Sequence, residues 1–207
     1  MKALFINGSP HTNGCTKRGL LEIEKVLKSK GIETEWIELG THDVKGCISC
    51  YYCFEHHKCV FNDIVNESVQ KFNDSDAVII GTPVYYAGPN GTLHSFLDRL
   101  FFSTSATVNK VMKIGATVVS SRRAGSTSAF DDINKYFTIS SMPIASSTYW
   151  NEVHGRKAED VEQDLEGLQT MRNLGNNIAF LVNAILSQKE KKGLPIQEKK
   201  VFTDFIK

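Results

Sequence analysis

The sequence predicts an α/β protein in which a doubly wound parallel sheet of five strands carries helices on both faces. Short apolar segments alternate with amphipathic helical patterns along the chain, which is typical of a parallel sheet. Residues 77–80 are apolar at every position, as expected of a strand whose two faces are both covered. A chain of 207 residues with 41% hydrophobic content is large enough to bury one sizeable core.

Local patterns predict each element in turn. Residues 2–7 form the first strand, and a helix at residues 16–30 ends at Gly31, a residue type favoured after a helix. Residues 34–39 form the second strand, and Asp63 is a suitable N-cap for a helix that ends near residue 73. The remaining strands are expected at residues 77–80, 113–120 and 143–147, and the remaining helices at residues 92–102, 129–137 and 158–187.

We expect a single domain over residues 1–187, which includes a cysteine-rich loop insertion at residues 41–60. This loop is unusually long for a strand-to-helix connection, and loops of that length are commonly functional or disordered. Residues 188–207 are expected to form a charged, solvated C-terminal tail.

Composition limits the class of partner. The formal net charge is +1 and no long basic stripe occurs, which argues against nucleic acid as the main partner. No apolar run approaches the roughly 18 residues of a membrane span, and Met1 and Lys2 lead directly into the first strand, so neither a membrane role nor a signal peptide is expected. A cytoplasmic location follows as the expectation. The five cysteines are then expected to be thiols or metal ligands rather than disulfides.

The loop between the first strand and the first helix has the composition of an anion site. Glycines let its backbone fold closely around a phosphate, and the unpaired N–H groups of the helix point at it with the helix dipole behind them. Ser9, Asn13 and Thr16 add polar side chains. The loop lacks the lysine of a Walker A loop and the Gly-x-Gly-x-x-Gly spacing, so it suits a phosphate monoester. The alternative is an ordinary tight turn with a helix cap.

Two further strands end in segments suited to a ligand. After the third strand, Pro83 stiffens a turn in which Tyr85 and Tyr86 present flat faces, unless these tyrosines only cap the sheet. After the fourth strand, residues 120–126 offer backbone N–H groups and arginines, unless they form an exposed basic turn. The carboxyl ends of parallel strands meet at one edge of a sheet. Together, the phosphate loop, the aromatic surface and the donor-rich loop describe a site for flavin mononucleotide (FMN).

At this point the chain resembles a known family. The motifs Gly8-Ser9-Pro10, Gly14-Cys15-Thr16, Thr82-Pro83-Val84-Tyr85-Tyr86 and Leu97-Asp98-Arg99 are similar to those of flavodoxin-fold NADPH-dependent FMN reductases, over at least residues 2–150. The resemblance implies the flavodoxin-like strand order 2-1-3-4-5, bound FMN, NAD(P)H as co-substrate, and homodimers or homotetramers that bury the flavin edge.

The same resemblance implies the cofactor-binding residues. The phosphate would be held by Ser9, Asn13, Gly14, Cys15 and Thr16. The ring system would be held by Pro83, Val84, Tyr85, Tyr86, Ala87, Gly88, Ser120, Ser121, Arg122, Arg123 and Gly125. Relatives often carry asparagine where Cys15 stands, and a thiol donates weakly, so the backbone N–H is the contact expected there.

A group of four cysteines lies in the loop insertion. Cys47, Cys50, Cys53 and Cys59 resemble the compact motif of iron–sulfur flavoproteins, a branch of the same family, which implies a 4Fe-4S cluster near the subunit interface that passes electrons to FMN. The motif departs from the ferredoxin run, because five residues precede the fourth cysteine and Val60 replaces proline. Free thiols without metal and a zinc site are the alternatives. His56 and His57 are expected to be solvated.

These features favour an FMN-dependent oxidoreductase that uses NAD(P)H to reduce a quinone, a flavin or another small acceptor. The alternatives are an electron relay of the iron–sulfur flavoprotein type fed by ferredoxin, a non-enzymatic flavodoxin-like carrier, and a non-redox phosphate-binding module. Arg122 or Arg123 is the candidate to face the flavin carbonyl edge or the 2′-phosphate of the nicotinamide cofactor. His154 is a candidate proton donor, unless the aromatic segment at residues 146–155 only packs the core or an interface.

Overall fold

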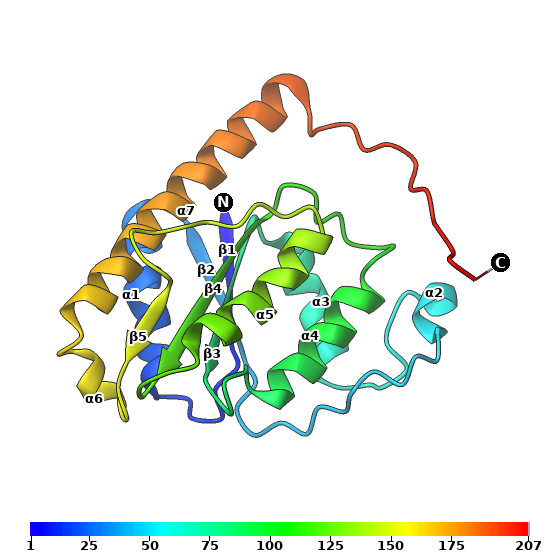
Figure 1. The fold of residues 1–207 in the computed structure, drawn as a ribbon. Helices are drawn as coiled ribbons and strands as arrows, with labels where there is room; N and C mark the ends of the chain where they lie inside the picture. The colour runs from blue at the N-terminus through cyan, green and yellow to red at the C-terminus, as the bar shows by residue number, and fades with distance from the viewer. Residues whose placement is uncertain (207) are drawn as a thin grey trace.

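The computed structural model describes residues 1–206 and shows a five-stranded parallel sheet in the order β2-β1-β3-β4-β5 (Figure 1). This order confirms the doubly wound fold class and the topology that the family resemblance implied. All strand pairs are parallel, so all carboxyl ends reach one edge of the sheet. The strands are β1 (Lys2–Asn7), β2 (Glu33–Glu38), β3 (Ala77–Pro83), β4 (Ile114–Ser121) and β5 (Glu152–His154).

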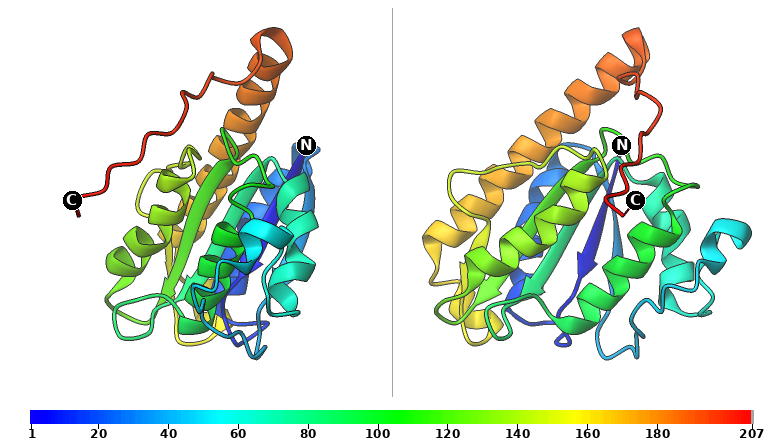
Figure 2. Two further views of the ribbon diagram at one scale, coloured as in Figure 1. Left: turned by 90° about the vertical axis from the view of Figure 1, so that its right-hand side faces the viewer. Right: turned by 45° about the vertical axis from the view of Figure 1, so that its right-hand side comes forward.

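Helices cover both faces of this sheet (Figure 2). One face carries α1 (Cys15–Ser29) and α7 (Leu165–Lys192), and the other carries α3 (Ile64–Asp74), α4 (Gly91–Ser103) and α5 (Ser126–Ile139). Two cores result, because alternate side chains of a strand point to opposite faces. In β1, Ala3 and Phe5 join the core under α1 and α7, whereas Leu4 and Ile6 join the core under α3 and α4.

The prediction of the fifth strand at residues 143–147 is wrong. The strand that completes the sheet is Glu152–His154, which pairs with Val119–Ser121 of β4, while Ile144 makes only an isolated bridge to Gly115. Three residues with a single buried apolar side chain, Val153, carry no periodic signal for a strand. Pairing with β4, rather than local propensity, therefore defines β5.

The prediction of one helix over residues 158–187 is also wrong. The segment divides into the short α6 (Ala158–Val161) and the long α7, with Asp164 between them. The Asp164 side chain accepts a hydrogen bond of 2.9 Å from the N–H of Gly167, so it caps α7 and starts a new helix. This helix continues to Lys192, beyond its expected end, and none of the helices in residues 1–206 is long and apolar enough to span a membrane.

The loop insertion contains a short helix that the sequence did not predict. This helix, α2 (Tyr52–His56), lies to one side of α3 and α4 (Figure 1). His56 and His57 are both exposed, in agreement with their expected solvation. The predicted N-cap at Asp63 is confirmed, since its carboxylate accepts a hydrogen bond of 3.1 Å from the N–H of Val65.

Candidate functional site

One large pocket lies at the carboxyl edge of the sheet. It is formed by the segments that follow β1, β3, β4 and β5, so residues from distant parts of the chain meet there. The residues that line it are Ser9 to Thr16, Pro83, Val84, Tyr85, Ser120, Ser121, Arg122 and Gly155 to Glu159. This is the edge where doubly wound folds bind their ligands.

The loop after β1 is held by hydrogen bonds to β3 and within itself. The Gly8 N–H donates to the Gly81 carbonyl of β3 at 2.8 Å, and a Cβ at Gly8 would lie 2.6 Å from Leu93 Cδ2 and 3.0 Å from that carbonyl oxygen, so a larger residue would displace its neighbours. The His11 N–H donates to Ser9 Oγ at 3.1 Å, and the Gly14 N–H donates to the His11 carbonyl at 3.1 Å. The loop therefore curls back on itself directly in front of α1.

The N-terminus of α1 is available to an anion. Gly14 is its N-cap, and among the described residues no side chain caps this helix and no acidic residue occupies its first turn. The N–H groups of that turn and the helix dipole therefore favour a bound negative charge. Burial is the largest contribution that raises the pKa of the Cys15 thiol. Cys15 thus stays neutral and does not repel an anion.

A short contact joins the start of α1 to the end of β4. Thr16 Oγ1 lies 2.7 Å from Ser120 Oγ, and both residues are buried. Because the two hydroxyls form one wall of the pocket, a ligand on the α1 side also meets the end of β4.

The loop after β3 presents its tyrosines on a strained turn. Tyr85 and Gly88 exchange two backbone hydrogen bonds of 2.9 and 3.0 Å, and Tyr86 and Ala87 between them have left-handed φ values of 51° and 60°. Such conformations cost a non-glycine residue about 1–3 kcal/mol and are common at functional sites. As a result, Tyr85 lines the pocket while the Tyr86 side chain is fully exposed beside it.

The structure brings together most of the cofactor residues that the sequence predicted. Of these, the pocket is lined by Ser9, Asn13, Gly14, Cys15, Thr16, Pro83, Val84, Tyr85, Ser120, Ser121 and Arg122. In the described chain, Tyr86, Ala87, Gly88, Arg123 and Gly125 lie in the same loops but outside the lining. Gly125 has a φ of 93°, and a Cβ on it would lie 2.9 Å from Cα of Ala87, so the loops after β3 and β4 touch.

Sequence reasoning missed the fourth wall of this pocket. Pro10, His11 and Thr12 complete the first loop, and the segment from Gly155 to Glu159 follows β5. Arg156 and Lys157 add two cationic residues to a pocket that Arg122 also lines, and Glu159 adds one acidic residue. The turn Gly155-Arg156-Lys157 could have been recognised as a ligand loop if the fifth strand had been expected at residues 152–154. Because that strand was expected at residues 143–147, the turn was not placed at the sheet edge.

His154 contacts the pocket through Ser121. The Ser121 hydroxyl lies 3.1 Å from Nδ1 of His154, and Nε2 of the same ring is 3.8 Å from a carboxylate oxygen of Glu152. Ser121 lines the pocket, whereas His154 does not. A hydroxyl therefore stands between this imidazole and any bound ligand.

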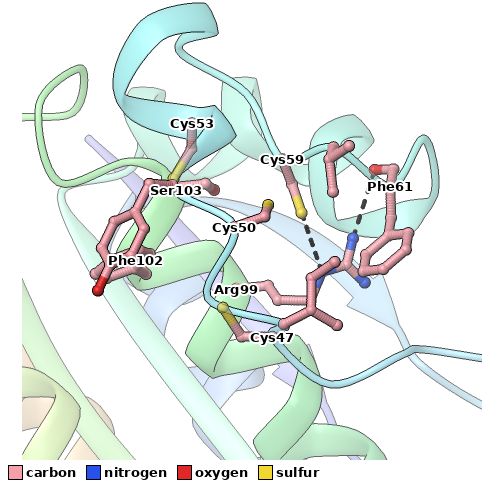
Figure 3. Close-up of a pocket in the computed structure, with 11 residues that line it drawn as sticks. Cys47, Cys50, Cys53, Cys59, Phe61, Arg99, Phe102 and Ser103 are labelled. Carbon is pink, nitrogen blue, oxygen red and sulfur yellow. Dashed lines mark hydrogen bonds between the residues drawn. The ribbon is translucent and has the colours of Figure 1, made fainter.

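A second pocket contains the four cysteines of the loop insertion. Figure 3 shows the sulfur atoms of Cys47, Cys50, Cys53 and Cys59 around one space beside Arg99. The rest of its wall is largely apolar and includes Ile48, Tyr51, Val60, Phe61 and Phe102. Among the described residues, no residue lines both this pocket and the one at the sheet edge.

The chemistry of the cysteine pocket suits a thiolate-bound centre. As they stand, no three histidine, cysteine or acidic side chains in residues 1–206 are grouped so that they could hold a metal ion. Four soft sulfur donors with apolar neighbours are nevertheless the donor set that iron–sulfur clusters use. Burial is the main reason why the pKa of Cys53 is raised, so without metal this residue is a neutral thiol. Cys47 and Cys50 form the exposed side of the pocket.

Sequence comparisons identify a matching family and similar proteins. Residues 1–156 match the protein family described as NADPH-dependent FMN reductase. An iron–sulfur flavoprotein of Methanocaldococcus jannaschii is 32% identical over 195 residues, which cover 89% of this chain and 99% of the relative. An iron–sulfur flavoprotein of Methanosarcina thermophila is 24% identical over 193 residues, which cover 92% of this chain and 100% of the relative.

Comparisons with solved structures agree on the fold. RosB with a bound derivative of riboflavin-5′-phosphate superposes with a TM-score of 0.73 at 14% identity, covering 100% of this chain and 94% of RosB. An archaeal flavodoxin superposes with a TM-score of 0.58 at 19% identity, covering 88% of this chain and 99% of the flavodoxin. At these identities the two likenesses establish the flavodoxin-like fold alone.

Proposed function

This chain belongs to the NADPH-dependent FMN reductase family, in its iron–sulfur flavoprotein branch, and on that premise we propose that it is an FMN-dependent electron-transfer protein with a second redox centre on its four cysteines. The observation that carries the proposal is the presence of two separate pockets in one chain. One joins a helix N-terminus to an aromatic turn, and the other is lined by Cys47, Cys50, Cys53 and Cys59.

The pocket at the sheet edge fits FMN, which when bound supplies both one-electron and two-electron redox chemistry. The uncapped N–H groups of α1, with Ser9 and Thr16, would hold its phosphate. Tyr85 would lie against the ring system, and Arg122 would place a positive charge at the polar edge of the ring. A fixed positive charge there would favour the added negative charge of the reduced flavin.

The four cysteines would hold a 4Fe-4S cluster, which when bound supplies one-electron chemistry. Their apolar neighbours would limit the access of water to Cys53 and Cys59, whereas Cys47 and Cys50 lie on the exposed side. Reduced ferredoxin is the proposed electron donor, and a small molecule is the proposed acceptor. We also propose that the protein is cytoplasmic and that it forms a homodimer or homotetramer. Size-exclusion chromatography with light scattering would measure the oligomeric state.

A specific observation favours a second candidate, NAD(P)H-dependent reduction of a quinone, a free flavin or another small acceptor. Arg122, Arg156 and Lys157 all line the pocket at the sheet edge. A flavin phosphate on the N-terminus of α1 would leave some of these cations free. They could bind the phosphates of a nicotinamide cofactor, with its ring against the exposed flavin face.

Anaerobic purification with analysis of FMN, iron and sulfide per chain tests the proposal. We expect about one FMN per chain, together with iron and sulfide that the Cys50→Ser variant lacks while it keeps its FMN. Rapid reduction by reduced ferredoxin supports the electron relay, and rapid reduction by NADPH or NADH supports the second candidate. A colourless protein that does not bind added FMN would contradict both.

A further inference from the structure

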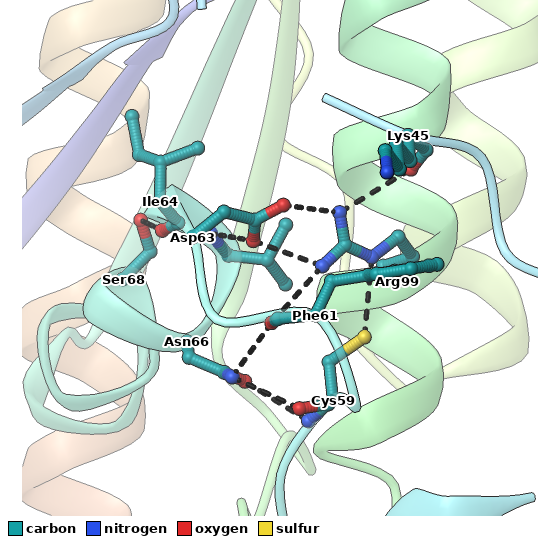
Figure 4. A network of polar contacts seen from close by, with 9 residues as sticks. Lys45, Cys59, Phe61, Asp63, Ile64, Asn66, Ser68 and Arg99 are labelled. Atoms are coloured by element: carbon teal, nitrogen blue, oxygen red, sulfur yellow. Dashed lines mark hydrogen bonds and ion pairs between the residues drawn. The ribbon is translucent and has the colours of Figure 1, made fainter. Parts of the chain in front are cut away.

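Arg99 is buried beside the cysteine pocket with all its N–H groups in use. It extends from α4, is 1% exposed, and its Nε–H donates to the sulfur of Cys59 at 3.2 Å (Figure 4). Nη1 and Nη2 donate to the two carboxylate oxygens of Asp63 at 2.7 and 2.9 Å. The remaining contacts are to the carbonyls of Lys45 at 3.2 Å and Phe61 at 3.4 Å. With five donors engaged, the guanidinium has one orientation.

Cys59 is held from its main chain as well. Asn66 of α3 accepts a hydrogen bond of 2.9 Å from the Cys59 N–H and donates one of 3.0 Å to the Cys59 carbonyl. Thus α3 holds the backbone of Cys59 and Arg99 of α4 holds its sulfur. Cys47 and Cys50 are exposed. Cys59 is therefore held at both its backbone and its sulfur.

The charges around the contact between Arg99 and Cys59 bear on how readily a centre bound to that sulfur is reduced. The guanidinium lies between the Asp63 carboxylate and the Cys59 sulfur, with Nε facing the sulfur. Reduction of a thiolate-bound centre adds negative charge that its sulfurs share, and an N–H donor to sulfur stabilises that charge. Burial strengthens the effect because water does not screen it.

We propose that Arg99 is a positioning residue that fixes Cys59 as a ligand and raises the reduction potential of the cysteine-bound centre. This inference rests on the proposed iron–sulfur function of the four cysteines. The reduction is a one-electron step in which no bond forms or breaks at Arg99, and dithionite supplies the electron in the assay below.

Two variants separate the charge of Arg99 from its hydrogen bond. Arg99→Lys keeps the charge and loses the planar fork that reaches Cys59 and Asp63 together. The double variant Asp63→Asn/Arg99→Met removes both charges of the pair, so no carboxylate is left unpaired, and asparagine is still a good N-cap for α3. Arg172→Met is the matched control, because it removes an arginine that pairs with Glu22 on the opposite side of the sheet.

The proteins are reconstituted anaerobically with iron and sulfide, and the midpoint potential is measured by dithionite titration followed by visible and EPR spectra. We expect the double variant to lose about tenfold in the equilibrium constant for reduction, which corresponds to about 59 mV for one electron. Arg99→Lys should fall between wild type and the double variant, and Arg172→Met should match wild type. Both Arg99 variants should also lose iron to a chelator several-fold faster.

The outcomes distinguish this inference from the function on which it rests. If loaded Arg99 variants have the wild-type potential and the wild-type rate of iron loss, Arg99 has no such role, although the cluster assignment stands. If the wild-type protein itself takes up no iron and sulfide, the cluster assignment fails, and the inference fails with it.

Discussion

The hydroxyl oxygen of Thr16, at the start of α1, lies 2.7 Å from that of Ser120, at the end of β4. This contact ties the start of α1 to the end of β4, two segments that are far apart in the chain and that both line the pocket at the sheet edge. The phosphate side and the ring side of the proposed FMN site are therefore in direct contact. A substitution on one side should also alter the position of groups on the other.

Thr16→Val tests that link. Valine keeps the shape of threonine and removes the hydroxyl, so the contact to Ser120 and one polar group at the phosphate are lost together. One hydrogen bond contributes about 0.5–1.5 kcal/mol, and we therefore expect the Kd for FMN to rise up to about tenfold. Quenching of flavin fluorescence measures the Kd. Thr138→Val, on the exposed surface of α5, is the control, and an equal effect there would contradict the prediction.

Gly125→Ala tests the contact between the loops after β3 and β4. Gly125 has a φ of 93°, and a methyl group would lie 2.9 Å from Cα of Ala87. We expect a loss of stability of about 1–3 kcal/mol together with weaker FMN binding. Gly31→Ala has a similar backbone strain, with φ of 74°, but open space around it and no place in the pocket. It should lower stability alone, which urea denaturation and FMN titration would distinguish.

Arg122 and Arg123 are adjacent in sequence but differ in position, because Arg122 lines the pocket at the sheet edge and Arg123 lies outside its lining. A hydrogen bond to a charged group contributes about 1.5–3 kcal/mol. We therefore expect Arg122→Gln to weaken the binding of FMN, or of NADPH if that is the substrate, at least about tenfold. Arg123→Gln should bind nearly as wild type. Similar losses in both variants would show that the side chains act only through their charge.

His154→Gln tests the route from His154 through Ser121. Glutamine can keep the hydrogen bond to the Ser121 hydroxyl, but it cannot donate a proton as an imidazolium does. We expect the FMN content to be unchanged and the rate of acceptor reduction to fall several-fold. Unchanged turnover at full FMN content would remove His154 as the proton donor.

Because Lys110 is buried, we expect the stability of the folded protein to depend on pH. Its ammonium donates to the Thr104 carbonyl at 2.7 Å, and burial, aided by nearby Lys113, lowers its pKa from 10.5 to about 8. Between these two values the unfolded chain still binds a proton that the folded chain has released. The free energy of unfolding should therefore rise with pH across this window, relative to Lys110→Met.

Urea denaturation of wild type and Lys110→Met at about pH 7 and about pH 10 measures this difference. We expect it to grow by an amount on the order of 1 kcal/mol, in favour of wild type, at the higher pH. Parallel stability curves for the two proteins would mean that Lys110 has an ordinary pKa in the folded state.

Features that depend on short stretches of chain could be predicted from sequence. Gly8, Ser9 and Thr16 mark an anion loop because a strand, a turn and a helix start follow one another within a few residues. The aromatic turn at Tyr85 and the donor-rich end of β4 are visible for the same reason. The position of the fifth strand could not be predicted in this way, because Val153 is its only buried residue and its position depends on pairing with β4.

The sequence by itself therefore determined the fold class, the family and the loops that meet at the sheet edge, because local periodicity and turn chemistry encode them. Only the tertiary structure decided that Arg156 and Lys157 join that site, that Arg122 rather than Arg123 lines it, and that Arg99 connects Asp63 to Cys59. These contacts are between residues whose separation in the sequence follows no recognisable motif. They arise from the packing of strands and helices against one another.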